Sequence, residues 1–151
     1  MTSLRDVVVP GGILLGVHAE DATTLLALVT ARLAGAPGMR DFEKFREVLA
    51  EKPPPFLDEN GCGILLAHAR TDSVTRLVLA AGRPAHPIPG AGSPLRLVFV
   101  FGIPTTLNSE YLRAVGSLAR VCSNAERLTE LLEVADPGEF LAVLAAGERP
   151  I

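Results

Sequence analysis

Three stretches in the middle of the chain are apolar at nearly every position. They are GILLAH at residues 63–68, TRLVLAAG at 75–82 and LRLVFVFG at 95–102. Because strands that are covered on both faces by helices carry apolar residues throughout, these stretches predict buried strands. Residues 4–17 add two shorter apolar runs, VVV and ILLGV, separated by the turn signal PGG. The pattern therefore predicts about five strands.

Two helices are predicted between the first runs and the middle strands, over residues 19–35 and 41–52. In the first, Leu25, Val29 and Leu33 recur at helical spacing, and acidic residues suit its start. The second has an apolar face and ends at the prolines of 53–55, because proline lacks the amide donor and clashes with the preceding turn.

The last third of the chain predicts three more helices, over residues 108–122, 125–135 and 137–147. Asn108 or Ser109 is expected to cap the first of them. Since a short polar loop joins 63–68 to 75–82, these two strands are expected to pair antiparallel. The predicted fold is α/β, a mixed central sheet of about five strands flanked by helices on both faces, as a single domain over residues 1–151.

Composition narrows the function classes. The 151 residues are 48% hydrophobic and 5% aromatic with no Trp, which is typical of a packed domain and not of a disordered chain. A net charge of −3 provides no basic surface for a nucleic acid, so no nucleic-acid partner is expected. The start of the chain shows no basic leader, and no apolar run approaches the roughly 18 residues of a membrane span. We therefore expect a cytoplasmic protein without membrane insertion.

Nucleotide, metal and thiol sites find little support. The Gly-rich segments PGGILLG and GAGSP both lead into strands, whereas a phosphate cradle needs amides at a helix N-terminus. The three histidines lack Cys or acidic neighbours at ligand spacing, so no metal and no cofactor is expected. Cys62 could pair with His68, yet six residues of strand span roughly 20 Å. Cys62 and Cys122 are better interpreted as core residues.

His68 is the strongest candidate for chemistry, because it ends an apolar strand and precedes the polar loop ARTDS. A rigid sheet rim is a common mount for functional groups. A partly exposed histidine without a function would produce the same pattern, so these residues alone leave both interpretations open.

The order of elements and the string NGCGILLAHARTDSV resemble the enzyme IIA domains of the fructose/mannitol type in the bacterial phosphotransferase system, including their nitrogen-regulatory relatives. Those domains carry a pattern of the form G-x-G-(apolar)-A-(apolar)-P-H-A-[RK], whose histidine is phosphorylated. Gly61, Gly63, His68, Ala69 and Arg70 match it. The later PLRLVFVFGIPTTLNSEYLRAVGSLARV and the closing helices are similar to the family too, over roughly residues 8–146.

Three departures from the family pattern matter for the chemistry. Ala67 replaces the proline before the active histidine, and Tyr111 stands where a second histidine usually assists the phosphoryl group. Lys52 occupies the place of an arginine sixteen residues before His68. Arginine presents a two-pronged donor to phosphate, whereas lysine is a point charge. Tyrosine donates one hydrogen bond and is neutral at pH 7.

The resemblance implies that His68 accepts a phosphoryl group from a histidine phosphocarrier protein. It would pass the group to an enzyme IIB component or signal to a regulatory target protein. Lys52 and Tyr111 would act beside His68, and Arg70, Thr71 and Ser109 would contact the phosphate or the partner. We expect the ARTDS loop, residues 69–73, and the start of the 108–122 helix to rim a shallow depression that holds His68. The alternative is a degenerate, non-catalytic regulatory module that keeps the fold and binds a partner protein.

Overall fold

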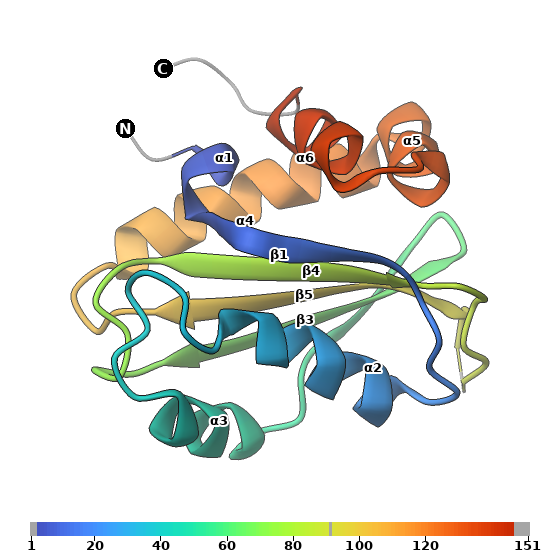
Figure 1. Ribbon diagram of the computed structural model, residues 1–151. Helices are drawn as coiled ribbons and strands as arrows, with labels where there is room; N and C mark the ends of the chain where they lie inside the picture. Colours follow the sequence, from blue (N-terminus) through green and yellow to red (C-terminus); the bar gives the residue numbers. More distant parts are fainter. Residues whose placement is uncertain (1–2, 91, 147–151) are drawn as a thin grey trace.

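The computed structural model describes residues 3–90 and 92–146, and in this part of the chain a five-stranded mixed sheet has the order β1-β4-β5-β3-β2 (Figure 1). The strands are β1 (Val8–Val17), β2 (Phe56–Glu59), β3 (Cys62–Arg70), β4 (Val78–Pro84) and β5 (Leu95–Ile103). The helices are α1 (Leu4–Val7), α2 (Ala22–Thr30), the 3-10 turn η1 (Ala31–Leu33), α3 (Phe42–Ala50), α4 (Asn108–Ser123), α5 (Ala125–Glu133) and α6 (Pro137–Ala146).

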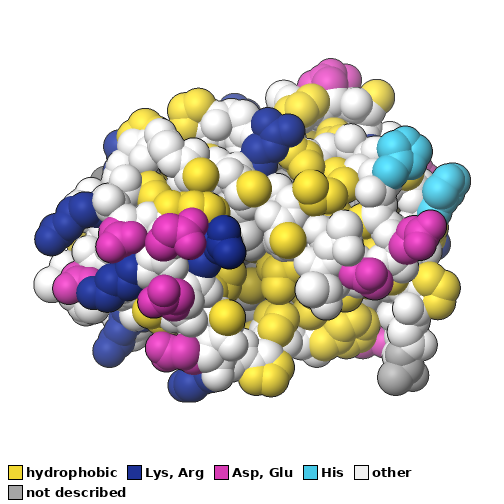
Figure 2. Space-filling model, turned by 60° about the horizontal axis from the view of Figure 1, so that its bottom comes forward, with side chains coloured by type: hydrophobic (Ala, Val, Ile, Leu, Met, Phe, Trp, Pro, Cys, Tyr) yellow, Lys and Arg dark blue, Asp and Glu magenta, His cyan; other side chains and the backbone are white. Residues whose placement is uncertain are grey.

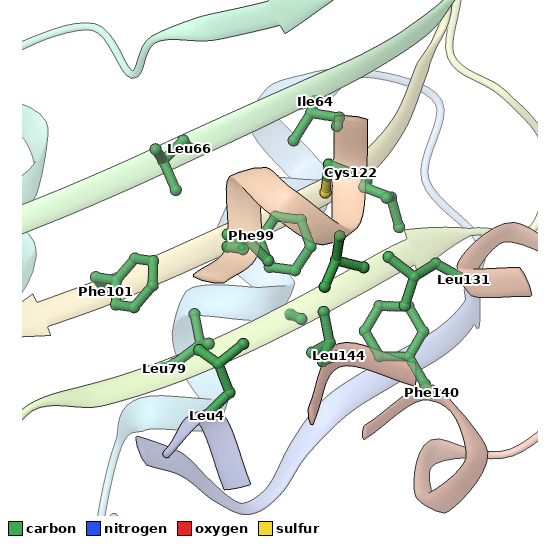
Figure 3. Close-up of a cluster of buried hydrophobic side chains, with 14 of the residues drawn as sticks. Leu4, Ile64, Leu66, Leu79, Phe99, Phe101, Cys122, Leu131, Phe140 and Leu144 are labelled. Atoms are coloured by element: carbon green, nitrogen blue, oxygen red, sulfur yellow. The ribbon is translucent and has the colours of Figure 1, made fainter. Parts of the chain in front are cut away.

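Helices cover both faces of the sheet. Helices α1, α4, α5 and α6 lie on one face, and α2 and α3 lie on the other (Figure 1). Along β5, Phe99 and Phe101 enter the core under α4 to α6, while Val98 and Val100 enter the core under α2 and α3. Figure 3 shows side chains of the first core, which include Phe140 of α6 and Phe99 and Phe101 of β5. Two-sided burial explains the continuously apolar strands, and the predicted fold class is confirmed.

The first predicted strands are wrong in detail. Residues 8–17 form one irregular strand and contain no turn. Val8 lies opposite Leu79 and Ile13 opposite Ala81, so β1 uses three more residues than β4 between these pairs. Gly11, with φ of +68°, allows this bulge because it has no side chain to clash in the left-handed region.

The fifth strand, β2, was not predicted from the sequence. Phe56–Glu59 is short, follows three prolines and carries two acids, so its pattern is that of a loop. It becomes a strand because it pairs antiparallel with the first half of β3, from Glu59 opposite Cys62 to Phe56 opposite Leu65.

The predicted pairing of β3 with β4 is also wrong, because β5 lies between them. β3 runs parallel to β5, and β4 runs antiparallel to it, so the sheet is mixed as expected. The connection from β3 to β4 is attached to the segment before α3, where the N–H groups of Arg40 and Asp41 donate to Ser73 O. This attachment carries the chain across the end of β5.

The helix starts predicted from the sequence are only partly confirmed by the structure. Asp21 caps α2, since its carboxylate accepts from Thr24 N–H at 2.7 Å. The expected cap of α4 by Asn108 or Ser109 is wrong: both lie in the first turn, and the capping position is Leu107. Gly147, the last residue of the predicted 137–147 helix, lies outside the described residues.

Truncation of the central strand should destabilise the whole molecule. Phe99 is fully buried between β5 and the helices of its face, so Phe99→Ala should lower the free energy of unfolding by about 3–5 kcal/mol. The exposed Leu28 provides a control, for which Leu28→Ala should change it by no more than about 0.5 kcal/mol. Urea unfolding measures both; equal losses would contradict this core assignment.

Candidate functional site

The site lies where the sheet edge is left open. Because the pairing with β2 ends at Leu65, the second half of β3 has no strand on the side away from β5. The last contact on that side is Leu66 N–H donating to Pro55 O. Strand alternation directs the N–H groups of His68 and Arg70 toward the same open edge. A cleft of about 680 Å³ follows this edge, between α3 on one side and the start of α4 on the other.

His68 is exposed in this cleft, two residues before the end of β3. Its Nδ1 lies 3.5 Å from Leu66 O. A carbonyl oxygen only accepts, so this contact is a hydrogen bond when Nδ1 carries the proton, which leaves the lone pair on Nε2. The structure thus favours an imidazole whose free nitrogen is the one away from the strand.

The ring of Tyr111 lies against the imidazole. The two ring centroids are 5.6 Å apart at an interplanar angle of 30°, and Tyr111 in turn meets Phe101 edge-on at 5.2 Å. Phe101 is the register partner of His68 on β5, so one β5 side chain supports the ring that covers the histidine. Stacked and edge-on aromatic pairs of this kind restrict ring orientation.

Two cations line the same cleft. Lys52 follows the C-terminal end of α3, and Arg70 ends β3; both side chains are exposed. Glu51 and Asn108 also line it, and Asn108, in the first turn of α4, is a site residue that sequence reasoning assigned only as a cap. An asparagine at a helix start is expected both for a cap and for a residue that lines a cleft, so the sequence could not distinguish these two roles for Asn108.

The two remaining sequence candidates do not line the cleft. Thr71 is buried, its N–H donates to Ile103 O, and its hydroxyl lies 3.1 Å from that of Ser73. Ser109 is exposed in the first turn of α4 beside Asn108. The structure therefore brings together His68, Lys52, Arg70 and Tyr111, and leaves Thr71 and Ser109 apart from them.

An ion pair ties α3 to the loop after His68. Lys44 Nζ lies 2.6 Å from Asp72 Oδ1, and both side chains are well exposed. The hydrogen bond from Lys44 lowers the pKa of Asp72, and the same bond raises the pKa of Lys44. Because both side chains are exposed, this contact contributes little to the stability of the fold.

The cysteines carry no reactive thiolate. Both are buried, and burial raises the pKa of Cys62 to about 11 and that of Cys122 to about 12. Over the residues that the structure describes, no three His, Cys, Asp or Glu side chains gather as a metal site. No helix in residues 3–90 and 92–146 is long and apolar enough to cross a bilayer.

A family model described as "Phosphoenolpyruvate-dependent sugar phosphotransferase system, EIIA 2" matches residues 9–147. The chain belongs to this family. The match covers the second core, the first core apart from Leu4, Val7 and Val8, and the whole His68 cleft. The resemblance seen in the residues around His68 therefore extends through most of the chain. The comparison with curated proteins gave no match.

Solved structures of EIIA proteins share the fold of this EIIA 2 domain. The nitrogen regulatory protein IIA-Ntr from Neisseria meningitidis has a TM-score of 0.69 at 21% identity, covering 92% of this chain and 97% of its own. IIA mannitol from Escherichia coli has a TM-score of 0.71 at 18% identity, covering 89% and 96%. The same TM-score, at 17% identity and covering 89% and 94%, is found for E. coli IIA-Mtl in complex with phosphorylated enzyme IIB-Mtl.

The ionisation of Tyr111 can be measured directly, because it is the only tyrosine of the chain. Burial raises the pKa of its phenol above the ordinary 10.0. The folded state therefore holds this proton more tightly than the unfolded state, so stability should be unaffected below pH 10 and fall as the pH rises beyond it.

A near-ultraviolet absorbance titration should give a midpoint above 10 for the folded protein and the ordinary value in denaturant. A folded midpoint at or below the denatured one would show that the ring is not sheltered beside His68.

Proposed function

We propose that this EIIA 2 domain is a phosphoryl carrier in which His68 accepts the phosphoryl group from a histidine phosphocarrier protein. The observation that carries the proposal is the exposed His68 imidazole, whose Nδ1 faces Leu66 O in a cleft with two cations. An imidazole held in this tautomer presents a nucleophilic Nε2 to an incoming phosphorus.

The transfer step is a substitution at phosphorus. The Nε2 lone pair forms a P–N bond, and the P–N bond of the donor's phosphohistidine breaks and returns its electron pair to the donor imidazole. No water or proton is consumed. The protein has little covalent chemistry to perform in such a step. Catalysis therefore depends mainly on positioning the two histidines and on stabilising the negative charge of the phosphoryl group.

Three features of the cleft support a bound phosphoryl group. Lys52 and Arg70 supply positive charge, and Arg70 has the fork that matches phosphate oxygens. Helix α4 begins at Asn108 without a side-chain cap, so its N-terminal amides and dipole favour a nearby anion. Tyr111 adds orientation, since its ring lies against His68 and is supported by Phe101.

The onward partner is proposed to be an enzyme IIB component, because the E. coli IIA-Mtl of the same fold is seen in complex with phosphorylated IIB-Mtl. Such an exchange takes place in the cytoplasm, where we place the protein. A regulatory target protein, as the name of the Neisseria relative suggests, is the second possible recipient.

One observation favours a second function, a non-catalytic module that binds a partner protein. Tyr111 occupies the position of the family's second histidine, and its raised pKa keeps it neutral. The site then lacks a second imidazole to stabilise the phosphoryl group. One labelling experiment separates the two functions.

Incubation with enzyme I, the phosphocarrier protein and phosphoenolpyruvate should add one phosphoryl group to the protein, read by intact mass spectrometry. His68→Ala should abolish the gain. His86→Ala is the matched control, because His86 is an exposed histidine that does not line the cleft and should label like wild type. Label on the His68→Ala protein would refute the assignment of the acceptor.

The altered residues should limit the rate of labelling. Tyr111→His restores a second imidazole, and Lys52→Arg restores a two-pronged phosphate contact. Since one preorganised charge-stabilising donor is worth about 2.7–4 kcal/mol, regaining one should raise the initial labelling rate on the order of a hundredfold. If wild type and the folded double variant both stay unlabelled, the non-catalytic function is the better one.

A further inference from the structure

A second depression lies on the face that carries α2 and α3. It is a groove of about 710 Å³ between the two helices, adjoining the His68 cleft. Helix α2 packs on β4 and β5, and α3 packs on β3, so each is held by the sheet. The facing positions include Ala27, Ala31 and Ala50, whose small side chains leave the space between the helices unfilled.

Helix α2 has apolar residues on the side that lines the groove as well as on the side that packs on the sheet. Leu25 and Val29 point into the sheet and are fully buried. Leu26 and Ala27 form a second apolar face of α2 that lines the groove, opposite Phe42 of α3. Figure 2, which looks onto this side of the molecule, shows apolar side chains through the middle of the face, a cluster of acidic and basic ones at the left, and acidic ones beside histidines at the right. Such a surface favours an apolar occupant.

The charges at the groove have one sign. Among its described lining residues the ionisable ones are Arg46 and Lys52, with no carboxylate. The Arg46 guanidinium lies 5.8 Å from the ring centroid of Phe42, which places it along the groove wall. Its exposed contact with Glu43, at 3.4 Å, is weak and can yield to a better-placed anion.

We propose that the α2–α3 groove is a binding site for an amphipathic carboxylate, whose apolar body lies between the helices and whose carboxylate contacts Arg46 and Lys52. The volume falls in the range of about 300–1,000 Å³ typical of small-molecule sites. Charge complementarity with Arg46 and Lys52 selects an anion.

Occupation of the groove regulates the His68 site, a consequence that rests on the proposed function. Five residues line both the α2–α3 groove and the His68 cleft, among them Leu26, Leu49 and Lys52. A carboxylate that engages Lys52 removes positive charge from the phosphoryl group. The ligand therefore slows labelling of His68, and phosphorylation weakens the ligand by the same coupling free energy.

The binding site can be tested with decanoate as the probe, by following backbone amide shifts of the ¹⁵N-labelled protein. Saturable shifts should appear in α2 and α3. Decanol and decyltrimethylammonium, with the same chain and a neutral or positive head, should bind at least tenfold more weakly, because a charge-assisted contact is lost or reversed.

Variants locate the site. Ala27→Trp should abolish binding by filling the groove, with Leu28→Trp as the matched control because Leu28 is exposed outside it. Arg46→Gln should weaken binding about tenfold, whereas Arg32→Gln, at an exposed arginine outside the groove, should leave it unchanged. If a tryptophan variant fails to fold, the probe series and the arginine pair still decide.

Binding that is equal for decanoate and decanol, or unchanged by Arg46→Gln, would overturn the proposal. So would shifts produced in these helices by the phosphocarrier protein but not by decanoate, since the groove would then be part of a protein interface. His68→Ala should bind decanoate like wild type. Binding in that variant, together with an unlabelled wild type, would refute the proposed function and leave the groove site standing.

Discussion

The burial of β5 on both faces is the constraint on which the rest of the structure depends. Its residues alternate between the two cores, and both helical layers pack against them. The strand also lies between β3 and β4, parallel to the first and antiparallel to the second, which makes the sheet mixed. Because Phe101 of this strand is the register partner of His68 and supports Tyr111, the central strand also sets the geometry of the site.

The site exists because the sheet is incomplete at one edge. A longer β2 would pair with all of β3 and close the cleft. Instead β2 covers only the first half, and the prolines before it form part of the cleft wall. The open edge exposes His68 and Arg70 on a strand whose other residues are buried, so both side chains have a rigid support and are accessible. This arrangement is the usual solution for groups that must be both fixed and reachable.

Two residues beside His68 depart from the family pattern, whereas the fold follows the family. Tyr111 packs against the core and lies over His68, so it keeps the orienting contact that an aromatic ring can make. It does not supply a second titratable imidazole. Lys52 lines both the His68 cleft and the α2–α3 groove, so its positive charge acts in both. The family fold thus holds an exposed histidine whose neighbours depart from the family pattern.

The sequence by itself determined the helices other than α1, the three buried strands in the middle of the chain and the acceptor candidate, because these depend on local periodicity and on the short motif around His68. It missed β2, whose four residues become a strand only through pairing with β3, and it placed a turn where Gly11 permits a bulge in β1. Only the tertiary structure decided that β5 separates β3 from β4, because strand order depends on contacts between distant segments. For the same reason it alone brought Lys52 and Tyr111 to His68 and buried Thr71 away from them.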